Sequence, residues 1–262
     1  MVEMDPGNPN AVLITGASSG IGEALARAYA QPGRFLALGG RDKGRLDRVA
    51  GDCRAFGAEV ETATVDVADR DAMRAWIEAV DDRRPIDLAV ANAGISAGTG
   101  GQGEEEAQAR AIFAVNLMGV LNTVWPALDR MRGRGRGQIA VISSIAGFRG
   151  LPGTPAYSAS KAAVKAYGEA LRGWLAQDGV KVSVVCPGFV RSRMTAKNDF
   201  PMPMIMDADK AARIIQKGLA ADKARIAFPW PMAAMMWLLG ALPPQWTDPL
   251  LKVAPKKAAA DE

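Results

Sequence analysis

Short apolar segments alternate with amphipathic stretches along almost all of this 262-residue chain, and this alternation constrains the fold more than any other feature. Strands buried on both faces of a parallel sheet have such near-continuous apolar sequences, and amphipathic stretches between them supply the crossover helices. The apolar segments lie at residues 11–17, 34–40, 59–67, 87–94, 137–144, 181–188 and 224–228. The alternation therefore predicts an α/β fold, a doubly wound parallel sheet of about seven strands flanked by helices.

The helical stretches between these segments show no internal repeat and no linker. They are predicted at residues 18–30, 46–56, 68–80, 104–131, 155–177 and 207–221. Without a break in composition, the simplest organisation is a single domain over residues 1–262. The polar first ten residues are expected to form a flexible leader, and residues 254–262 are expected to fray. In such a fold, ligands bind in the crevice at the carboxyl ends of the strands.

The composition excludes several kinds of site. The chain has no histidine and only two cysteines, Cys53 and Cys186, so histidine-based catalysis is unavailable and no metal site is expected. Two separated cysteines and no signal peptide predict a reducing, cytoplasmic location. A net charge of +4 is too small to indicate nucleic-acid binding, and the arginines at residues 130–136 are interpreted as a solvated loop.

A glycine-rich turn with the spacing G-x-x-x-G-x-G follows the first predicted strand. Glycines allow the backbone to approach a phosphate, and the helix that follows presents free N–H groups and its positive dipole end. Because the turn comes directly after strand one, it predicts a dinucleotide site rather than a simple tight turn. The residues expected to contact the dinucleotide here are Gly16, Ser18, Ser19, Gly20, Ile21 and Gly22.

The end of the second predicted strand bears on the choice of cofactor. It reads Gly39-Gly40-Arg41, where a carboxylate would accept hydrogen bonds from a ribose 2′-hydroxyl group and favour NAD. An arginine at this place suits a 2′-phosphate instead, although Asp42 follows it. The sequence therefore predicts that NADP(H) is preferred and that NAD(H) is possible.

Three further strand ends complete the predicted cofactor site. Asp66 and Val67 end the third strand, and the Asp66 carboxylate could accept a hydrogen bond from an adenine amino group. Asn92-Ala93-Gly94 ends the fourth strand, where Asn92 either contacts the adenosine ribose or braces the sheet. Pro187-Gly188 ends the sixth strand and is expected to turn the chain against the nicotinamide.

Tyr157 and Lys161 lie four residues apart in the motif YSASK on a predicted helix, downstream of Ser144. This spacing places both side chains on one helical face. A phenol has a reference pKa of about 10, and an ammonium group ~4 Å away would stabilise the phenolate by roughly 4 kcal/mol, which lowers its pKa by about three units. With the Ser144 hydroxyl holding a substrate oxygen, the trio predicts proton transfer to or from a carbonyl or alcohol oxygen.

In their order along the chain, these motifs resemble the single-domain branch of the short-chain dehydrogenase/reductase family, which has a Rossmann-like fold. The usual pair of asparagines before Ala-Gly is here Ala91-Asn92, a small departure from the family pattern. The matching positions, collinear over about 175 residues, are TGASSGIG (15–22), Asp66, ANAG (91–94), Asn116, Ser144, YSASK (157–161) and Pro187-Gly188.

The resemblance implies a role for each catalytic residue. Tyr157 would donate the proton in reduction and accept it in oxidation, and Lys161 would lower the pKa of Tyr157 and bind the nicotinamide ribose. Ser144 would orient the substrate oxygen; it is preferred over Ser143 because the family's serine lies thirteen residues before its tyrosine. Asn116 would hold a water in a proton relay with Lys161. The resemblance also implies a small-molecule carbonyl or alcohol substrate and a homodimer or homotetramer.

Two apolar segments bear on the substrate. Residues 189–206, which form a mobile lid in the family, contain four methionines that predict an adaptable wall for a medium-sized or bulky hydrophobic substrate, or that simply pack beneath the lid. The apolar C-terminal extension, residues 228–251, contains three tryptophans. It is interpreted as a subunit interface or cover on the core, as a pocket wall, or as shallow attachment to a membrane surface, which Lys252, Lys256 and Lys257 would favour.

The leading functional hypothesis is an NADP(H)-dependent enzyme that interconverts a carbonyl and a secondary alcohol by hydride transfer. An enzymatic alternative is a 3-oxoacyl-carrier-protein reductase, with Arg191 and Arg193 as candidates for binding the acidic carrier. An alternative of another class is an NADP(H)-binding redox sensor without turnover, which would have no use for the tuned phenol of Tyr157.

Overall fold

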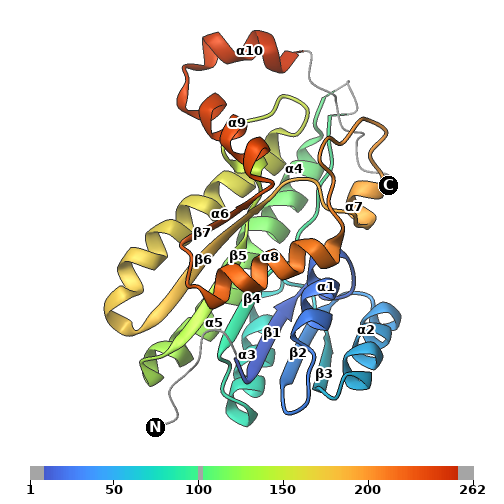
Figure 1. Ribbon diagram of the computed structural model, residues 1–262, viewed down its shortest axis with the longest axis vertical. Helices are drawn as coiled ribbons and strands as arrows, with labels where there is room; N and C mark the ends of the chain where they lie inside the picture. Colours follow the sequence, from blue (N-terminus) through green and yellow to red (C-terminus); the bar gives the residue numbers. More distant parts are fainter. Residues whose placement is uncertain (1–8, 100–102, 253–262) are drawn as a thin grey trace.

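The computed structural model describes residues 9–99 and 103–252, and within them it shows one parallel sheet with helices on both faces (Figure 1). The strands are β1 (Ala11–Thr15), β2 (Phe35–Gly40), β3 (Glu59–Thr64), β4 (Leu88–Ala91), β5 (Gly137–Ile142), β6 (Val180–Pro187) and β7 (Arg225–Phe228). Their order is β3-β2-β1-β4-β5-β6-β7, and every neighbouring pair is parallel. The doubly wound fold is confirmed, and the order of the strands reverses between β1 and β4.

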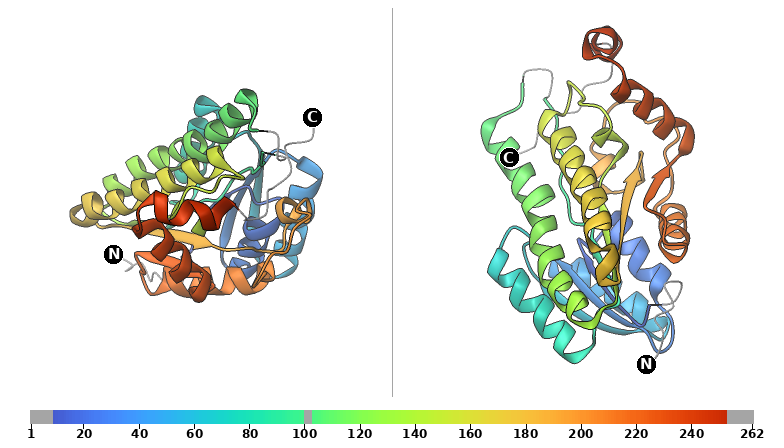
Figure 2. Two further views of the ribbon diagram at one scale, coloured as in Figure 1. Left: turned by 90° about the horizontal axis from the view of Figure 1, so that it is seen from above. Right: turned by 90° about the vertical axis from the view of Figure 1, so that its left-hand side faces the viewer.

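Helices cover the two faces of the sheet in two groups, as Figure 2 shows from two further directions. The helices are α1 (Gly20–Tyr29), α2 (Lys43–Ala55), α3 (Arg70–Arg83), α4 (Glu106–Phe113), α5 (Gly119–Arg134), α6 (Pro155–Trp174), α7 (Arg193–Ala196), α8 (Ala208–Ala220), α9 (Trp230–Ala241) and α10 (Pro244–Lys252). The core packed by α3, α5 and α6 contains Leu13 of β1, whereas the core packed by α1, α2 and α8 contains its neighbours Val12 and Ile14. Successive side chains of a strand therefore enter opposite cores.

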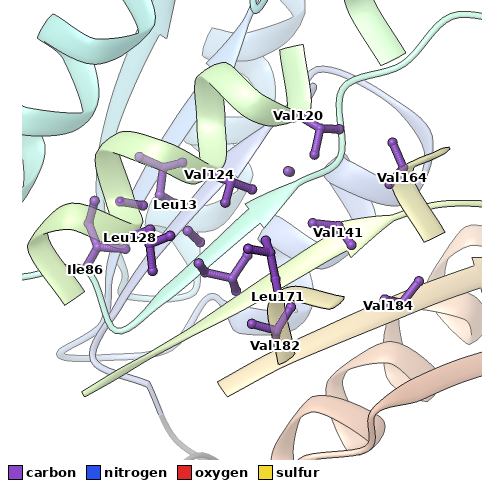
Figure 3. Close-up of a cluster of buried hydrophobic side chains, with 14 of the residues drawn as sticks. Leu13, Ile86, Val120, Val124, Leu128, Val141, Val164, Leu171, Val182 and Val184 are labelled. Carbon is purple, nitrogen blue, oxygen red and sulfur yellow. The ribbon is translucent and has the colours of Figure 1, made fainter. Parts of the chain in front are cut away.

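Figure 3 shows part of the first of these cores. Leu13, Val141 and Val184 from three strands meet Val124 and Leu128 of α5, and all five are almost fully buried. Burying such a side chain stabilises the folded protein by about 1.5–3 kcal/mol. The strands are therefore held rigidly, and the residues that follow their carboxyl ends project from a fixed edge.

The helix predicted over residues 104–131 is interrupted. A π turn, η1 (Ala114–Met118), separates α4 from α5 and contains Asn116. The complete helical run, Glu106–Arg134, is long and apolar enough to cross a bilayer, but 56% of its most apolar window is buried within the protein. This is the behaviour of a core helix, as the packing of Val124 and Leu128 shows.

The interpretation of residues 130–136 as a solvated loop is wrong for most of that run. Arg130, Arg132 and Arg134 belong to the last turns of α5, where cations interact favourably with the negative end of the helix dipole. Arg134 donates to the carboxylate of Asp81 at 2.6 Å, and Asp81 is almost fully buried. The pair ties α5 to α3.

Candidate active site

A cavity of about 970 Å³ opens at the carboxyl ends of the strands and extends from the glycine-rich turn to α9. It brings together most of the side chains and turns that the sequence singles out, from six strand ends and α6. The predicted residues that line it are Gly16, Ser18, Ser19, Gly20, Ile21, Arg41, Asp66, Val67, Asn92, Ala93, Gly94, Ser144, Tyr157, Lys161, Pro187 and Gly188. Gly22 and Asn116 are absent from this lining.

The glycine-rich turn forms a cradle that a side chain would fill. Gly16 has a φ of +66°, and a Cβ added there would lie 2.8 Å from the Cα of Ala93. Gly22 lies behind the cradle, since its added Cβ would lie 2.4 Å from the carbonyl oxygen of Gly16. Ser19 precedes α1 without capping it through its side chain, so the first N–H groups of the helix remain available to an anion. The cradle fits a dinucleotide diphosphate.

Asn92 braces the cradle. Its amide nitrogen Nδ2 donates to the carbonyl oxygens of Thr15 and Gly16 at 2.9 and 3.2 Å, and its backbone N–H donates to the Thr15 hydroxyl. These bonds tie the end of β4 to the end of β1. Of the two roles considered for Asn92, the structure shows the bracing role, while contact with a ribose stays a prediction.

The end of β2 forms a basic corner of the cavity. Gly40 leaves room beside Ser18, and the guanidinium groups of Arg41 and Arg45 both line the space. The Asp42 carboxylate is engaged elsewhere: it caps α2 by accepting from the backbone N–H of Arg45 and pairs with the Arg45 guanidinium at 2.9 Å. The Nε of Arg45 is buried without a hydrogen-bond partner, which suits a corner built for an additional anion.

Asp66 lies beside this corner at the end of β3. One carboxylate oxygen accepts from the backbone N–H of Ala68 at 2.9 Å, and the other lies 3.9 Å from the guanidinium of Arg41. Asp66 and Arg41 thus lie side by side in the cavity lining. Its hydrogen bond to an adenine amino group stays a prediction.

Ser144, Tyr157 and Lys161 meet at the other end of the cavity. The Ser144 hydroxyl, which follows β5, lies close enough to the Tyr157 phenol to lower its pKa; it donates to the carbonyl of Pro187 at 3.4 Å and accepts from the backbone N–H of Ala146 at 3.1 Å. The Lys161 ammonium lies 5.8 Å from the centre of the Tyr157 ring and donates to the carbonyl of Ile142 at 2.9 Å. One hydroxyl, one phenol and one ammonium group therefore converge where a small oxygen atom could lie.

The neighbouring hydroxyl of Ser143 is used structurally. It donates to the backbone carbonyl of Lys161 at 2.7 Å and so holds α6 against the end of β5. Ser143 is therefore engaged with the backbone of α6, whereas the Ser144 hydroxyl interacts with Tyr157; the role of Ser144 toward a substrate oxygen stays a prediction.

The pKa of Tyr157 differs from the sequence expectation. Burial raises the pKa of Tyr157 above its ordinary value, and the hydrogen bond with Ser144 opposes this effect. Lys161 does not reverse the shift, because its ammonium lies over the ring, is bonded to Ile142, and is itself removed from water. Burial lowers the pKa of Lys161 to about 8. At neutral pH the phenol is therefore protonated, which suits a proton donor.

Asn116 lies behind the catalytic trio, in the π turn. Its side chain is fully buried: Oδ1 accepts from the backbone N–H of Ile95, and Nδ2 donates to the Ile95 carbonyl and the Ser160 hydroxyl at 2.9 and 3.2 Å. The amide thus joins the chain after β4 to α6. A water relay through its amide nitrogen would have to displace one of these bonds, and the relay stays a prediction.

The substrate end of the cavity has apolar walls from two segments. Phe189 and Phe200 of the predicted lid pack edge to face with ring centres 6.1 Å apart. A backbone bridge between Val190 and Met206 closes the base of this segment. The opposite wall is α9, whose Met232, Met235 and Met236 line the cavity.

Gly188 allows α9 to reach the site. A Cβ added to Gly188 would lie 3.0 Å from the Pro229 ring and 3.3 Å from the sulfur of Met232. Among the three interpretations of the C-terminal extension, the structure therefore shows a pocket wall, and the burial of Met232, Ala233 and Met236 shows that α9 also covers the core.

Sequence reasoning missed Arg45 and left the role of the α9 methionines open. Arg45 is four residues after Arg41, in the first turn of the helix that follows β2, and that position is the signal that could have revealed it. The methionines have no comparable signal, since their place in the cavity depends on how the chain returns after β7.

Comparisons with known proteins agree with this geometry. The model of the short chain dehydrogenase family matches residues 10–201. An uncharacterized oxidoreductase of Myxococcus xanthus is 38% identical over 94% of this chain and 96% of its own length. A Burkholderia phymatum short chain dehydrogenase/reductase solved with NAD is 26% identical, with a TM-score of 0.82 over 98% of this chain and 100% of its own. A Sphingobium yanoikuyae short-chain dehydrogenase solved with NADPH is 27% identical, with a TM-score of 0.78 over 96% and 98% of the two chains.

Proposed function

Because this chain belongs to the short-chain dehydrogenase family and is a nicotinamide-dependent oxidoreductase of alcohol and carbonyl groups, we propose that it is an NADP(H)-dependent reductase of medium-sized or bulky hydrophobic carbonyl compounds. The observation that carries the proposal is the meeting of Ser144, Tyr157 and Lys161 in one cavity with the glycine cradle and an apolar wall.

The residues of this chain bind the cofactor, orient the substrate and protonate the substrate oxygen. When bound, the nicotinamide supplies or accepts the hydride. The Ser144 hydroxyl holds the substrate oxygen beside the phenol, and the Tyr157 phenol gives that oxygen its proton in reduction. The Lys161 ammonium, fixed by Ile142, provides the positive charge that stabilises the phenolate left behind. The raised pKa of Tyr157 keeps the proton in place until the substrate oxygen gains negative charge.

The preference for NADP(H) is supported by the basic corner at the end of β2. The corner has no carboxylate at Gly40, and the carboxylate of Asp42 is already bonded to the start of α2. Arg41 and Arg45 supply guanidinium groups whose planar N–H donors match a phosphate. Relatives of known structure were solved with either NAD or NADPH, so the preference is a proposal from these side chains alone.

The hydrophobic substrate is supported by the methionines and phenylalanines of the two walls. A methionine side chain is flexible and polarisable, so such walls adapt to apolar groups of different shapes. Of the two arginines considered for the carrier-protein alternative, Arg191 is paired with the Asp207 carboxylate at 2.9 Å, whereas Arg193 lines the cavity.

The test is oxidation of NADPH, with NADH in parallel, across small ketones, bulky hydrophobic ketones and aldehydes, quinones, and 3-oxoacyl thioesters. We expect the highest kcat/KM with NADPH and a bulky hydrophobic carbonyl compound. Fastest turnover of carrier-bound thioesters would favour the carrier-protein alternative. Tight NADPH binding without turnover of any alcohol or carbonyl compound would favour the redox sensor.

A further inference from the structure

The outer surface of the C-terminal helices is unusually apolar. Half of the large hydrophobic side chains that are exposed in the described residues lie in α9 and α10. Three are tryptophans, with exposed fractions of 76% for Trp230, 57% for Trp237 and 66% for Trp246. We call this set the tryptophan patch; it consists of Trp230, Met235, Trp237, Leu238, Trp246 and Leu250.

We propose that the tryptophan patch attaches the protein to the surface of an anionic lipid bilayer. The proposal is independent of the reaction proposed above, because it concerns the outer side of α9 and not the catalytic trio. The chain has no charged residue from 226 to 247, so neither α9 nor the turn into α10 resists entry into the apolar edge of a membrane.

The length of α9 suits a helix that lies in the surface and does not cross it. With twelve residues it is about 18 Å long, against a hydrocarbon core of about 30 Å. Tryptophan is the side chain that favours the boundary between lipid headgroups and acyl chains, because its ring is apolar and its N–H group can bond to water or headgroups. Trp230 and Trp237 are seven residues apart and therefore share one side of α9.

The position of the helices also favours a surface contact. Figures 1 and 2 show α9 and α10 together at one end of the molecule, beyond the carboxyl ends of the strands. α10 is held there by Arg149, which donates to Asp248 at 2.6 Å and to the buried hydroxyl of Thr247. The patch is therefore presented on a fixed support.

Charge complementarity identifies the lipid as anionic. The protein has a net charge of +4, and the sequence places Lys252, Lys256 and Lys257 directly after the patch, ahead of Asp261 and Glu262. Anionic headgroups attract such lysines.

Continuity with the cavity favours lipid over a second copy of the chain. Met235 belongs to the patch, with 54% of its surface exposed, and it also lines the cavity. A second copy seated on the patch would cover this edge of the cavity. A fluid lipid surface would leave it accessible and would place an apolar substrate beside it.

The test is sedimentation of the full chain with vesicles of phosphatidylcholine and with vesicles that also contain phosphatidylglycerol. We expect binding to the anionic vesicles that weakens with added salt, and weaker binding to the neutral ones. The double variant Trp237→Ser/Trp246→Ser should bind the anionic vesicles about tenfold or more weakly. Trp174→Ser is the matched control, because Trp174 is an exposed tryptophan of α6 outside the patch, and it should bind like the parent.

Quenching of tryptophan fluorescence by brominated lipids is a second measurement, which reports contact of the tryptophans with lipid directly. Brominated lipids should quench the tryptophan fluorescence of the parent and of Trp174→Ser, and quench the double variant much less. Absence of sedimentation of the parent with either vesicle would overturn the proposal, as would equal loss in the control. A dimer by light scattering that dissociates only in the double variant, with no vesicle binding by the parent, would assign the patch to a second copy.

Discussion

Lys161 is a cation that the fold keeps almost completely out of water. Its ammonium has the Ile142 carbonyl as a hydrogen-bond acceptor, and burial lowers its pKa to about 8 from an ordinary value of 10.5. The charge that helps Tyr157 release its proton therefore reduces the stability of the cofactor-free protein, a common property of functional sites.

The free-energy cost of burying the Lys161 ammonium predicts how the stability of the protein depends on pH. Between the folded pKa of about 8 and the unfolded pKa of about 10.4, the unfolded chain holds more protons at Lys161, so its contribution to stability rises with pH in this window. Below pH 8 Lys161 is charged in both the folded and the unfolded protein, and its burial destabilises the folded protein by the full amount. Lys161→Met buries no ammonium group and has no such penalty. The amount by which its free energy of unfolding exceeds that of the parent should therefore shrink by about 3 kcal/mol from pH 8 to above pH 10. Urea unfolding of both proteins measures this, and a difference that does not vary with pH would contradict it.

At the basic corner, Arg41 and Arg45 should together determine the preference for NADPH over NADH. Arg41→Ala and Arg45→Ala should each raise the dissociation constant for NADPH roughly tenfold or more, because each removes a charge-assisted contact to phosphate, while NADH binding changes little. Arg48→Ala is the matched control, since Arg48 lies in the same helix outside the cavity lining. Fluorescence titration with both cofactors gives the ratios. An equal loss of affinity for NADPH and NADH would show that these arginines do not bind the 2′-phosphate.

Among the elements, α1 depends most on one close approach to the site. Gly22→Ala would place a Cβ 2.4 Å from the Gly16 carbonyl oxygen and force the cradle to shift, so NADPH binding should weaken roughly tenfold or more. Gly51→Ala is the matched control: Gly51 lies inside α2 with no atom within 4 Å of the added Cβ, and alanine there should stabilise by about 0.5–1 kcal/mol. Calorimetry and NADPH titration separate the two effects. Unchanged binding in Gly22→Ala would contradict the cradle.

The strands and most helices could be predicted from the sequence because their apolar periodicity is strong, but their ends could not. β1 stops at Thr15 and β4 at Ala91, two and three residues before the predicted ends. The residues beyond these ends, Gly16-Ala17 and Asn92-Ala93-Gly94, are small and mostly uncharged and extend the apolar pattern, yet they turn to form the cradle. The π turn around Asn116 has no signal in local composition, since it depends on contacts with Ile95 and Ser160.

The site residues that belong to a sequence motif could be predicted. The contacts between segments that are distant in the sequence could not. Ser144, Tyr157 and Lys161 could be named in advance because their spacing is specific. The carboxylate of Glu104, by contrast, accepts from the backbone N–H of Ala156 at the start of α6. No pattern in the sequence places those two residues together.

Across the whole molecule, the C-terminal helices α9 and α10 are attached to the body at a few points, and α9 supplies one wall of the site. Gly188 and Gly240 bring α9 against the body, since a Cβ on Gly240 would lie 2.1 Å from the Phe148 carbonyl oxygen. Arg149 secures α10 and stands in the segment that connects Ser144 to Tyr157. The wall and the catalytic residues are thus linked through one short stretch of chain.

Removing the contacts between Arg149 and α10 should change the choice of substrate more than the rate of the chemical step. Arg149→Ala leaves the Thr247 hydroxyl and Asp248 without their partner, so α10 should detach more often and chymotrypsin should cut the C-terminal helices faster. The KM for bulky hydrophobic substrates should rise more than the KM for small ones, with kcat for the small ones nearly unchanged. Arg110→Ala, which removes an exposed pair with Glu106 in α4, serves as the control. Cleavage and KM values like those of the control would show that the link has no such role.

A comparison of Tyr157→Phe with Tyr167→Phe measures whether the Tyr157 phenol is the proton donor of a reductase. Both variants remove a phenolic hydroxyl from α6. With NADPH and the best carbonyl substrate of the parent, we expect Tyr157→Phe to lose at least about a hundredfold in kcat while its affinity for NADPH stays near that of the parent. Tyr167→Phe should retain parental turnover. Turnover by Tyr157→Phe at a rate close to that of the parent would contradict the account.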